Sequence, residues 1–402
     1  MKLFAKNLRN RFSLNISTKL ELAKELSDPL TFSLIDNKGN LHDNKTFFSE
    51  KEIKTFKHVL RKMEETTVID DILLKAQRQG RISFYMTASG ELGAILGSTS
   101  ALDFDDMIFS QYRESSALYY RGFNIKQMTD NCTGNQYDCN KGRQMPIHYS
   151  SKALNFFSIS SPIGTQIPQA AGYGYGLKTS AKKQVAVTYF GDGAASEGDF
   201  YTALNFSKTL GSQTLFICRN NEYAISTPLK EQTSGKSIMD KARAFGIHSL
   251  MVDGNDVPAV YKATEYLRKL ILYNKEPAFL EAMTYRLSDH STSDHSILYR
   301  SQEEIDIWKN NNDPIKRLRS FLKYYNHIDD KFEDEIAQAK INVKKEVIKC
   351  LNESVNEKLP PVESFFEDVY AEMPDSLNLQ KEKLQKHIKL YENHYDLKRH
   401  AK

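Results

Sequence analysis

The 402-residue sequence has few cysteines and no long apolar run. Its four cysteines, Cys132, Cys139, Cys218 and Cys350, form no C-x-x-C pair and have no zinc-site spacing, so we interpret all four as reduced thiols. No segment approaches the roughly 20 apolar residues that a membrane-crossing helix needs. This excludes a spanning helix, and we expect no membrane partner.

The sequence also has little excess of one charge sign over the other. The net charge of +4 is small for this length, and no basic stretch is interleaved with aromatic residues, so nucleic acid is not expected as a partner. The G-x-G-x-x-G and P-loop patterns are missing, which counts against a nucleotide-binding protein. The content of 40% hydrophobic and 26% charged residues is typical of a soluble globular protein with one to three domains.

The most informative stretch runs from residue 185 to residue 227. Apolar runs at 185–190 and 214–218 predict two strands, and residues 199–210 between them predict a helix, with Ser196 at the spacing of a cap. A β-α-β unit returns the chain parallel to its first strand, so both strand ends lie on one edge of the sheet. We therefore expect Asp192 and Asn221, which follow these strands, to be neighbours.

Such a pair has the chemistry of a magnesium site. A carboxylate and an amide oxygen are hard ligands, and Mg²⁺ fills its octahedron with waters and phosphate oxygens. The phosphates would lie at the turn formed by Gly193, Ala194 and Ala195, near a helix N-terminus, where free N–H groups attract anions. The alternative is an ordinary turn followed by an ordinary strand exit.

Other segments extend the predicted fold. Strand signals at 107–109, 249–252 and 278–284 alternate with helical patterns, which predicts an α/β fold with a doubly wound, mostly parallel sheet and ligands at the carboxyl ends of the strands. Residues 28–45 read as a turn-containing segment, and residues 130–151 as a long loop over the mouth of the site. Helices are predicted at 50–79, from 168, and at 257–273, 315–325, 330–352 and 379–391.

These motifs carry a resemblance. Gly191-Asp192-Gly193, then residues 194–219, then Asn220-Asn221 resembles the thiamin diphosphate fingerprint of 2-oxo acid decarboxylases. Further motifs narrow the resemblance to the alpha subunits of branched-chain 2-oxo acid dehydrogenases; they lie at 80–86, 111–114, 141–146, 159–162, 281–286 and 290–294. The similarity runs in the same order along the chain from about residue 65 to about residue 325. The resemblance implies a thiamin-diphosphate-binding fold with a helical C-terminal extension.

The resemblance also implies a site. It assigns Mg²⁺ to Asp192, Asn221 and the Tyr223 carbonyl, and makes His290, a side chain that titrates near neutrality, the catalytic residue that assists transfer to the lipoyl group. The implied cofactor contacts are Tyr112, Arg113, Ser161, Ile163, Gly193, Ala194, Arg219 and His290. The implied potassium ligands are Ser160, Pro162, Thr165 and Gln166. Ser291 and Ser301 match positions that a dedicated kinase phosphorylates, and Asp289 stands where the family usually has a second histidine.

The function implied by the resemblance is oxidative decarboxylation of branched-chain 2-oxo acids, with acyl transfer to a lipoyl group. Only one α/β sheet pattern is evident, so we expect a beta subunit to supply the glutamate that activates the cofactor. The implied assembly has two alpha and two beta chains on a lipoyl acyltransferase core, with a regulatory kinase and phosphatase. The alternatives are a pyruvate dehydrogenase alpha subunit, a scaffold without catalysis, and the nucleotide-binding protein considered above.

The start of the chain predicts where in the cell the protein is located. Residues 1–20 are basic, contain serine and have no acid, which is typical of a mitochondrial transit peptide, so we expect the protein in the mitochondrial matrix. The predicted division is a transit segment at 1–25, an N-terminal extension at 26–60, a dehydrogenase domain at 61–330 and a helical extension at 331–402.

Overall fold

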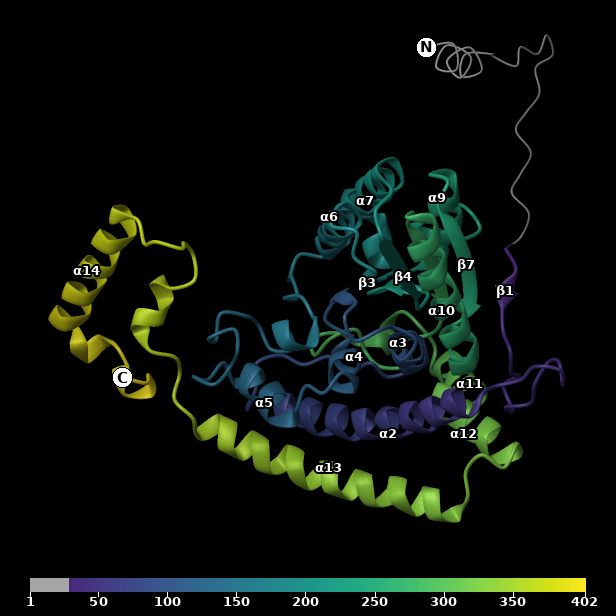
Figure 1. The fold of residues 1–402 in the computed structure, drawn as a ribbon. Helices are drawn as coiled ribbons and strands as arrows, with labels where there is room; N and C mark the ends of the chain where they lie inside the picture. The colour runs from purple at the N-terminus through teal and green to yellow at the C-terminus, as the bar shows by residue number, and fades with distance from the viewer. Residues whose placement is uncertain (1–28) are drawn as a thin grey trace, which may run out of the picture.

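The computed structural model describes residues 29–402, so the predicted transit segment lies outside the described residues. Six parallel strands form one sheet in the order β1-β7-β8-β4-β3-β2 (Figure 1). Their bounds are β1 Thr31–Phe32, β2 Met107–Phe109, β3 Ala186–Gly191, β4 Thr214–Asn220, β7 His248–Asp253 and β8 Ala278–Met283. A separate hairpin joins β5 Tyr223–Ala224 to β6 Thr227–Pro228. The predicted α/β class is confirmed, and all five predicted strands are present.

Both faces of the sheet are buried. In β4, Leu215 and Ile217 belong to one hydrophobic cluster, whereas Phe216 and Cys218 belong to another. Adjacent residues of a strand point to opposite faces, so a parallel sheet covered on both sides has a continuous apolar sequence. This explains why the strand runs could be identified without an alternating pattern, and it confirms Cys218 as a buried core residue and a free thiol.

Helices cover both faces (Figure 1). One face packs against α3 and α10, with α2, α12 and α13 behind them, and the other packs against α6, α7 and α9. The α-helices are α2 Glu50–Arg78, α3 Leu92–Thr99, α4 Ser115–Tyr120, α5 Ile125–Thr133, α6 Gln166–Thr179, α7 Gly198–Leu210, α8 Leu229–Gln232, α9 Ile238–Ala244, α10 Val257–Asn274, α11 Gln302–Asn311, α12 Pro314–Tyr324, α13 Asp330–Asn356 and α14 Asp375–Leu390. Short 3₁₀ turns include η2 Gly193–Ser196 and η3 Ser296–Leu298.

The ends of the long helices follow local sequence rules. Ser49 and Glu52 form a capping box at the start of α2, and the chain leaves that helix through Gly80, whose φ is +74°. Asp256 caps α10 by accepting a hydrogen bond from the Ala259 N–H. The acidic run before α10 therefore forms a turn and a helix cap.

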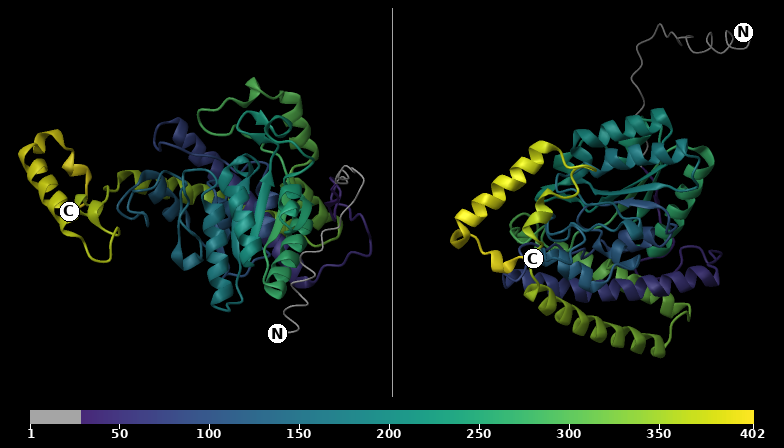
Figure 2. Two further views of the ribbon diagram at one scale, coloured as in Figure 1. Left: turned by 90° about the horizontal axis from the view of Figure 1, so that it is seen from above. Right: turned by 60° about the vertical axis from the view of Figure 1, so that its left-hand side comes forward.

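The C-terminal part leaves the sheet domain along α13. This helix lies beside α2 and contributes Val343, Val347 and Leu351 to the larger core. Beyond it, α14 and the last residues stand apart from the sheet (Figure 2). Lys141 ties this arm to the body through ion pairs with Glu367 and Asp368. The division into four segments stays a prediction.

The segment at 28–45 contains the predicted turns, and in addition Thr31 and Phe32 pair with β7 as a parallel strand, which two residues are too short to reveal by periodicity. Two local predictions are wrong. Residues 130–133, expected in a loop, form the last turn of α5. Ser196 does not cap α7, because Glu197 occupies the N-cap position and the Ser196 hydroxyl instead accepts a hydrogen bond from Gln232 at 2.8 Å.

The glycines of α6 test how tightly that helix packs. A Cβ at Gly174 would lie 2.3 Å from Thr214 Oγ1, so Gly174→Ala should lower the free energy of unfolding by about 1–3 kcal/mol through overpacking. An added Cβ at Gly172 meets nothing within 4 Å, so Gly172→Ala should raise it by about 0.5–1 kcal/mol. Urea titration measures both. A Gly174→Ala variant as stable as wild type would contradict the packing.

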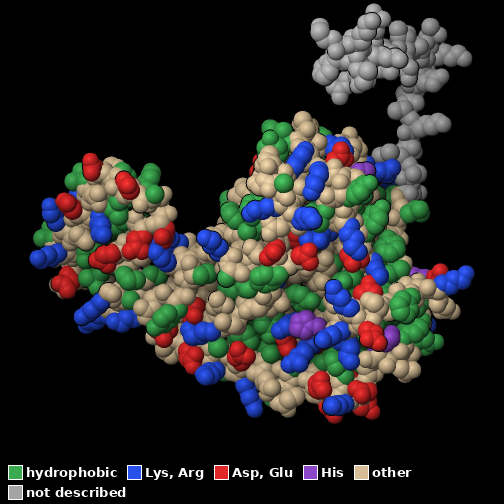
Figure 3. Space-filling view, viewed as in Figure 1, with side chains coloured by type: hydrophobic (Ala, Val, Ile, Leu, Met, Phe, Trp, Pro, Cys, Tyr) green, Lys and Arg blue, Asp and Glu red, His purple; other side chains and the backbone are tan. Residues whose placement is uncertain are grey.

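The visible surface is mixed in charge. Basic and acidic side chains are interspersed on the face shown in Figure 3, in keeping with the small net charge. Within residues 29–402, none of the helices combines the length and apolar character that crossing a bilayer requires.

Candidate active site

Two neighbouring strand ends bring the predicted metal ligands together. β3 and β4 are paired so that Gly191 lies opposite Arg219, and the residues that follow leave the sheet at the same edge. The Asn221 N–H donates a hydrogen bond to Asp192 Oδ1 at 3.4 Å. The predicted proximity of Asp192 and Asn221 is therefore confirmed.

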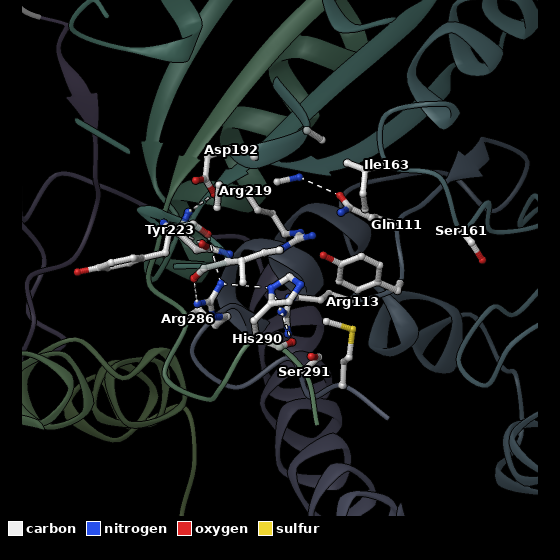
Figure 4. Close-up of a pocket in the computed structure, with 18 of the residues that line it drawn as sticks. Gln111, Arg113, Ser161, Ile163, Asp192, Arg219, Tyr223, Arg286, His290 and Ser291 are labelled. Atoms are coloured by element: carbon white, nitrogen blue, oxygen red, sulfur yellow. Dashed lines mark hydrogen bonds between the residues drawn. The ribbon is translucent and has the colours of Figure 1, made fainter. Parts of the chain in front are cut away.

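A cavity of about 550 Å³ opens at this edge (Figure 4). The predicted site residues that line it are Tyr112, Arg113, Ser161, Ile163, Asp192, Gly193, Ala194, Arg219, Asn221, Tyr223, His290 and Ser291. They come from strand ends and from the loops at 111–113, 161–163 and 286–291, which are far apart in the sequence. Ser160, Pro162, Thr165, Gln166 and Ser301 do not line it.

Asp192 has the environment of a cation ligand. Its side chain is buried, and burial raises its pKa to about 6. Among residues 29–402 its Oδ2 atom has no hydrogen-bond partner. A buried carboxylate oxygen without a partner is costly, and a hard cation would satisfy it. The Asn221 Oδ1 atom accepts only a long bond, 3.3 Å, from the Tyr223 N–H. These residues fit Mg²⁺.

The Tyr223 carbonyl is already engaged. Arg286 Nη1 donates to it at 3.2 Å, and Arg286 Nη2 donates to the Ile225 carbonyl at 2.6 Å. A carbonyl oxygen has two lone pairs, so one remains for a cation. Arg286 thereby fixes the hairpin that carries Tyr223.

The turn after β3 forms an anion cradle. Gly193 and Ala194 open the 3₁₀ turn η2, where the first N–H groups have no partner within the helix. A Cβ at Gly193 would lie 3.1 Å from the Ala224 Cβ, so a larger residue would crowd the hairpin. Backbone donors at such a position attract phosphate oxygens.

Three arginines surround the cavity floor, all nearly inaccessible to solvent: Arg113, Arg219 and Arg286. Arg219 forms ion pairs with Glu91 and with Glu114, the latter at 2.5 Å. Arg113 donates to the Thr87 carbonyl at 2.7 Å and to the His290 carbonyl at 2.8 Å. These three cations offset the negative charge of Glu91, Glu114 and Asp192 around the floor, and their N–H groups are donors suited to an anionic ligand.

His290 is neutral and its tautomer is fixed. Its Nδ1 atom lies 3.2 Å from Arg113 Nη2 and 3.4 Å from Arg286 Nη1. A guanidinium can only donate, so Nδ1 accepts and the ring proton resides on Nε2. Burial and the two arginines lower the pKa of His290 to about 3. The prediction that His290 titrates near neutrality is therefore wrong, because the sequence does not reveal two buried cations beside one loop histidine.

This shift predicts a pH effect on stability. The folded pKa lies below the unfolded value of about 6.5, so the His290 contribution is complete above pH 6.5 and is lost as the pH falls toward 3. Without cofactor, wild type should lose up to about 1.4 kcal/mol per pH unit more than His290→Gln within this window. Urea titrations from pH 7 to pH 4 measure the difference. Identical slopes for the two proteins would contradict the assigned environment.

The predicted potassium loop precedes α6. The Thr165 hydroxyl donates to the Pro162 carbonyl at 2.8 Å, so two of the expected ligands converge. The Gln166 side chain is buried and donates to the Tyr189 carbonyl, which leaves its amide oxygen as an acceptor. The neighbouring Ser161 and Ile163 side chains reach the cavity.

The two predicted phosphorylation positions differ in setting. Ser291 is partly buried and lines the cavity beside His290. Ser301 is exposed, and its hydroxyl caps α11 by accepting a hydrogen bond from the Glu304 N–H at 3.1 Å. Asp289 accepts hydrogen bonds from the Ser296 N–H and hydroxyl, at 2.9 and 2.6 Å, which closes the loop between them.

Sequence reasoning missed several residues of the site. Gln111 and Arg286 lie in motifs that carry the resemblance, yet neither was assigned a role. Gln111 Oε1 accepts the Gly191 N–H at 3.0 Å and so fixes the turn before Asp192. Glu114 also lies in such a motif but had no assigned role, and Glu91 lies in none, because a buried carboxylate cannot be told from a surface one in a single sequence. Other unassigned residues that line the cavity include Phe84, Met86, Met145, His148 and Glu197.

The fold and the site define a class of protein with an anion-binding pocket, lined by a buried carboxylate, at the edge of a parallel sheet. The profile of the dehydrogenase E1 component family matches residues 60–363, and the chain belongs to this family. Thiamin diphosphate is the cofactor that this membership assigns to the pocket.

Three relatives are named 2-oxoisovalerate dehydrogenase subunit alpha, mitochondrial. The chain is 41% identical over 375 residues to that of Dictyostelium discoideum, covering 92% of this chain and 83% of the relative. It is 45% identical over 348 residues to the protein of Homo sapiens, covering 87% and 77%. It is also 45% identical over 336 residues to that of Caenorhabditis elegans, covering 83% and 77%.

Proposed function

We propose that this chain is the alpha subunit of a branched-chain 2-oxo acid dehydrogenase, acting on 2-oxo acids such as 3-methyl-2-oxobutanoate and transferring the acyl group to the lipoyl group of an acyltransferase core. The observation that carries the proposal is the identity of 41–45%, over most of the chain, to relatives named 2-oxoisovalerate dehydrogenase subunit alpha. The pocket supports it, because its ligand set suits a diphosphate with a divalent ion.

The residues have separate tasks in this function. Asp192 Oδ2, Asn221 Oδ1 and the Tyr223 carbonyl would hold Mg²⁺, and the N–H groups of Gly193 and Ala194 would hold the diphosphate. When bound, thiamin diphosphate supplies the nucleophilic carbon and the electron sink for decarboxylation. This chain fixes the tail of the cofactor so that its reactive carbon faces the substrate.

Side chains above the cavity floor would complete the cofactor site. Arg113 would contact a terminal phosphate oxygen and so add a charge-assisted hydrogen bond. His290 would offer its Nε2–H as a donor on the substrate side, while Tyr112, whose ring meets the imidazole edge-on at 6.1 Å, limits its rotation. Ser161 and Ile163 would close the side of the pocket. Arg219 would support the cofactor from behind the cavity floor, because its guanidinium is already paired with Glu91 and Glu114.

The active assembly contains a beta subunit and an acyltransferase core. The described residues form one six-stranded sheet and one hairpin, so the glutamate that activates the aminopyrimidine comes from the beta chain in this proposal. Two alpha and two beta chains make up the assembly. Residues 1–25 would direct the chain to the mitochondrial matrix, in agreement with relatives named mitochondrial.

Two further elements belong to the proposal. Ser160, Pro162, Thr165 and Gln166 would bind K⁺ and stiffen the loop that carries Ser161. A kinase and a phosphatase would act on Ser291 and Ser301. A phosphate on Ser291 would bring negative charge to the edge of the diphosphate pocket, where repulsion disfavours cofactor binding.

The test of function is a substrate series. The alpha chain co-expressed with its beta chain should turn over 3-methyl-2-oxobutanoate with a kcat/KM at least about tenfold above that for pyruvate, and the alpha chain alone should be inactive. A preference for pyruvate would favour the pyruvate dehydrogenase alternative. Full activity of the isolated alpha chain would contradict the dependence on a beta subunit.

A further inference from the structure

Asp70 is a buried acid on α2 that has no part in the site described above. Only 6% of the residue is exposed. Tyr85 Oη donates a hydrogen bond to its Oδ1 atom at 2.8 Å, and the Ala88 N–H donates to Oδ2 at 2.9 Å. Burial raises the pKa of Asp70 to about 6 against the effect of these two bonds. At pH 7.5 the carboxyl group is therefore still mostly ionised, and it acts only as an acceptor.

Both donors belong to an irregular segment between α2 and α3. Residues 82–88 form neither helix nor strand, and within the described part of the chain no backbone group of residues 82–87 bonds to another backbone group. Glycines with positive φ stand at the two ends of the segment, Gly80 at +74° and Gly90 at +91°. The two hydrogen bonds to Asp70 therefore take the place of the backbone pairing that fixes a helix or a strand.

The same segment forms part of the pocket wall. Phe84 and Met86 line the cavity, whereas the hydroxyl of Tyr85, which lies between them in the sequence, reaches Asp70. Successive side chains thus face opposite sides, one toward the cavity and the next toward α2. A shift of the segment would move the apolar wall against which a substrate side chain packs.

The segment also holds an arginine of the site. The Thr87 carbonyl accepts a hydrogen bond from Arg113 Nη1 at 2.7 Å. From its other nitrogen, Nη2, Arg113 donates to the His290 carbonyl at 2.8 Å. Thr87 is next to Ala88, whose N–H is bound by Asp70, so the orientation of the guanidinium depends on where Asp70 places the backbone.

We propose that Asp70 is a positioning residue for the cofactor and substrate pocket: it anchors residues 84–88, so that Phe84 and Met86 face the cavity and the Thr87 carbonyl orients Arg113. This inference rests on the proposed function, in which Arg113 contacts the diphosphate. It adds that the affinity for the cofactor depends on a carboxylate that does not line the cavity.

An amide can replace the carboxylate in this role. A tyrosine hydroxyl both donates and accepts, so in Asp70→Asn the amide oxygen can accept from the Ala88 N–H while the NH₂ group donates to Tyr85 Oη. Asp70→Leu keeps the branched shape of the side chain but makes neither bond. If Asp70 acted through the attraction of its charge for Arg113, both substitutions would remove the effect.

Glu64 provides a matched control on the same helix. It is also 6% exposed, and it accepts hydrogen bonds from Arg319 Nη2 at 2.7 Å and from Lys340 Nζ at 2.6 Å. These bonds connect α2 to α12 and α13 and not to the pocket segment. Glu64→Met and Asp70→Leu should each lower the unfolding midpoint of the cofactor-free pair by several degrees, because each removes two buried hydrogen bonds.

The experiment titrates thiamin diphosphate into the co-expressed alpha and beta pair at saturating Mg²⁺ and follows binding by calorimetry. For Asp70→Leu we expect the Kd of thiamin diphosphate to rise at least about tenfold and the KM for 3-methyl-2-oxobutanoate at least about fivefold, because the guanidinium and the apolar wall are both displaced. For Asp70→Asn and for Glu64→Met we expect both constants to stay within about twofold of wild type.

A milder variant serves if Asp70→Leu does not assemble. Tyr85→Phe keeps the ring and removes one of the two bonds, and its Kd for thiamin diphosphate should rise at least about threefold. An unchanged Kd in Asp70→Leu, or in Tyr85→Phe where that variant is used, would overturn the proposal.

Two further results would contradict the positioning role. A Kd for Asp70→Asn as high as that for Asp70→Leu would assign the effect to charge, and an equal rise for Glu64→Met would assign it to general destabilisation. Wild type that binds no thiamin diphosphate would instead overturn the proposed function.

Discussion

Asp192→Asn is expected to lower kcat/KM of the assembled enzyme by at least about 10³-fold, the equivalent of about 4 kcal/mol. The variant keeps the shape of the side chain and can still accept the hydrogen bond of the Asn221 N–H. What it loses is the anionic oxygen, Oδ2, that has no partner among the described residues. Without this charge, the proposed site would hold a divalent ion only weakly, and binding of the diphosphate would weaken with it.

The same substitution should stabilise the protein without cofactor. Burial raises the pKa of Asp192 to about 6, so at pH 7.5 the folded protein retains a carboxylate in an unfavourable place. Removing it should raise the free energy of unfolding by roughly 1–3 kcal/mol. Urea titration of the cofactor-free protein and steady-state kinetics of the assembled enzyme measure the two effects.

The control for Asp192→Asn is Asp199→Asn, in the first turn of α7, where the side chain is exposed and does not line the cavity. It should leave kcat/KM within about twofold. An Asp192→Asn variant that keeps wild-type activity, or that destabilises the protein without cofactor, would show that Asp192 is a structural residue.

Arg219→Met is expected to lower the free energy of unfolding by about 3–5 kcal/mol, a large part of the stability of an ordinary chain. Arg219 is buried between Glu91 and Glu114. Its removal leaves two buried carboxylates with one fewer cation between them. The penalty comes from these uncompensated charges and not from the lost attraction alone.

A neutral triple variant separates the two causes. Adding Glu91→Gln and Glu114→Gln to Arg219→Met removes both stranded charges, so most of the lost stability should return. Circular dichroism during urea unfolding gives the free energies of the single and triple variants. If the triple variant is less stable than Arg219→Met alone, the penalty does not arise from stranded carboxylates.

The edge of the sheet could be predicted from sequence because it depends on local patterns. The runs that became β3 and β4 are apolar, of strand length and separated by a helix, and the parallel return follows from that spacing alone. Asp192 and Asn221 are neighbours for this reason, before any resemblance is considered. The strand β1 could not be predicted in the same way, because two residues are too few to show a pattern.

The electrostatics of the site could not be predicted in this way. Glu91, Glu114 and Arg286 come from three segments, and their meeting depends on tertiary packing. The pKa of His290 fell to about 3 because Arg113 and Arg286 flank it, a fact of geometry that no spacing encodes. Sequence therefore predicted the ligand atoms, and the structure was needed to find the charges around them.

One measurement tests the central claim most directly. In crystals of the alpha and beta pair grown with thiamin diphosphate and Mn²⁺ in place of Mg²⁺, the anomalous signal of the metal locates the ion. We predict one peak about 2.0–2.3 Å from Asp192 Oδ2 and Asn221 Oδ1, with phosphate oxygens completing its shell. A metal peak that only one of these residues contacts, or a diphosphate bound away from the turn at Gly193, would contradict the account.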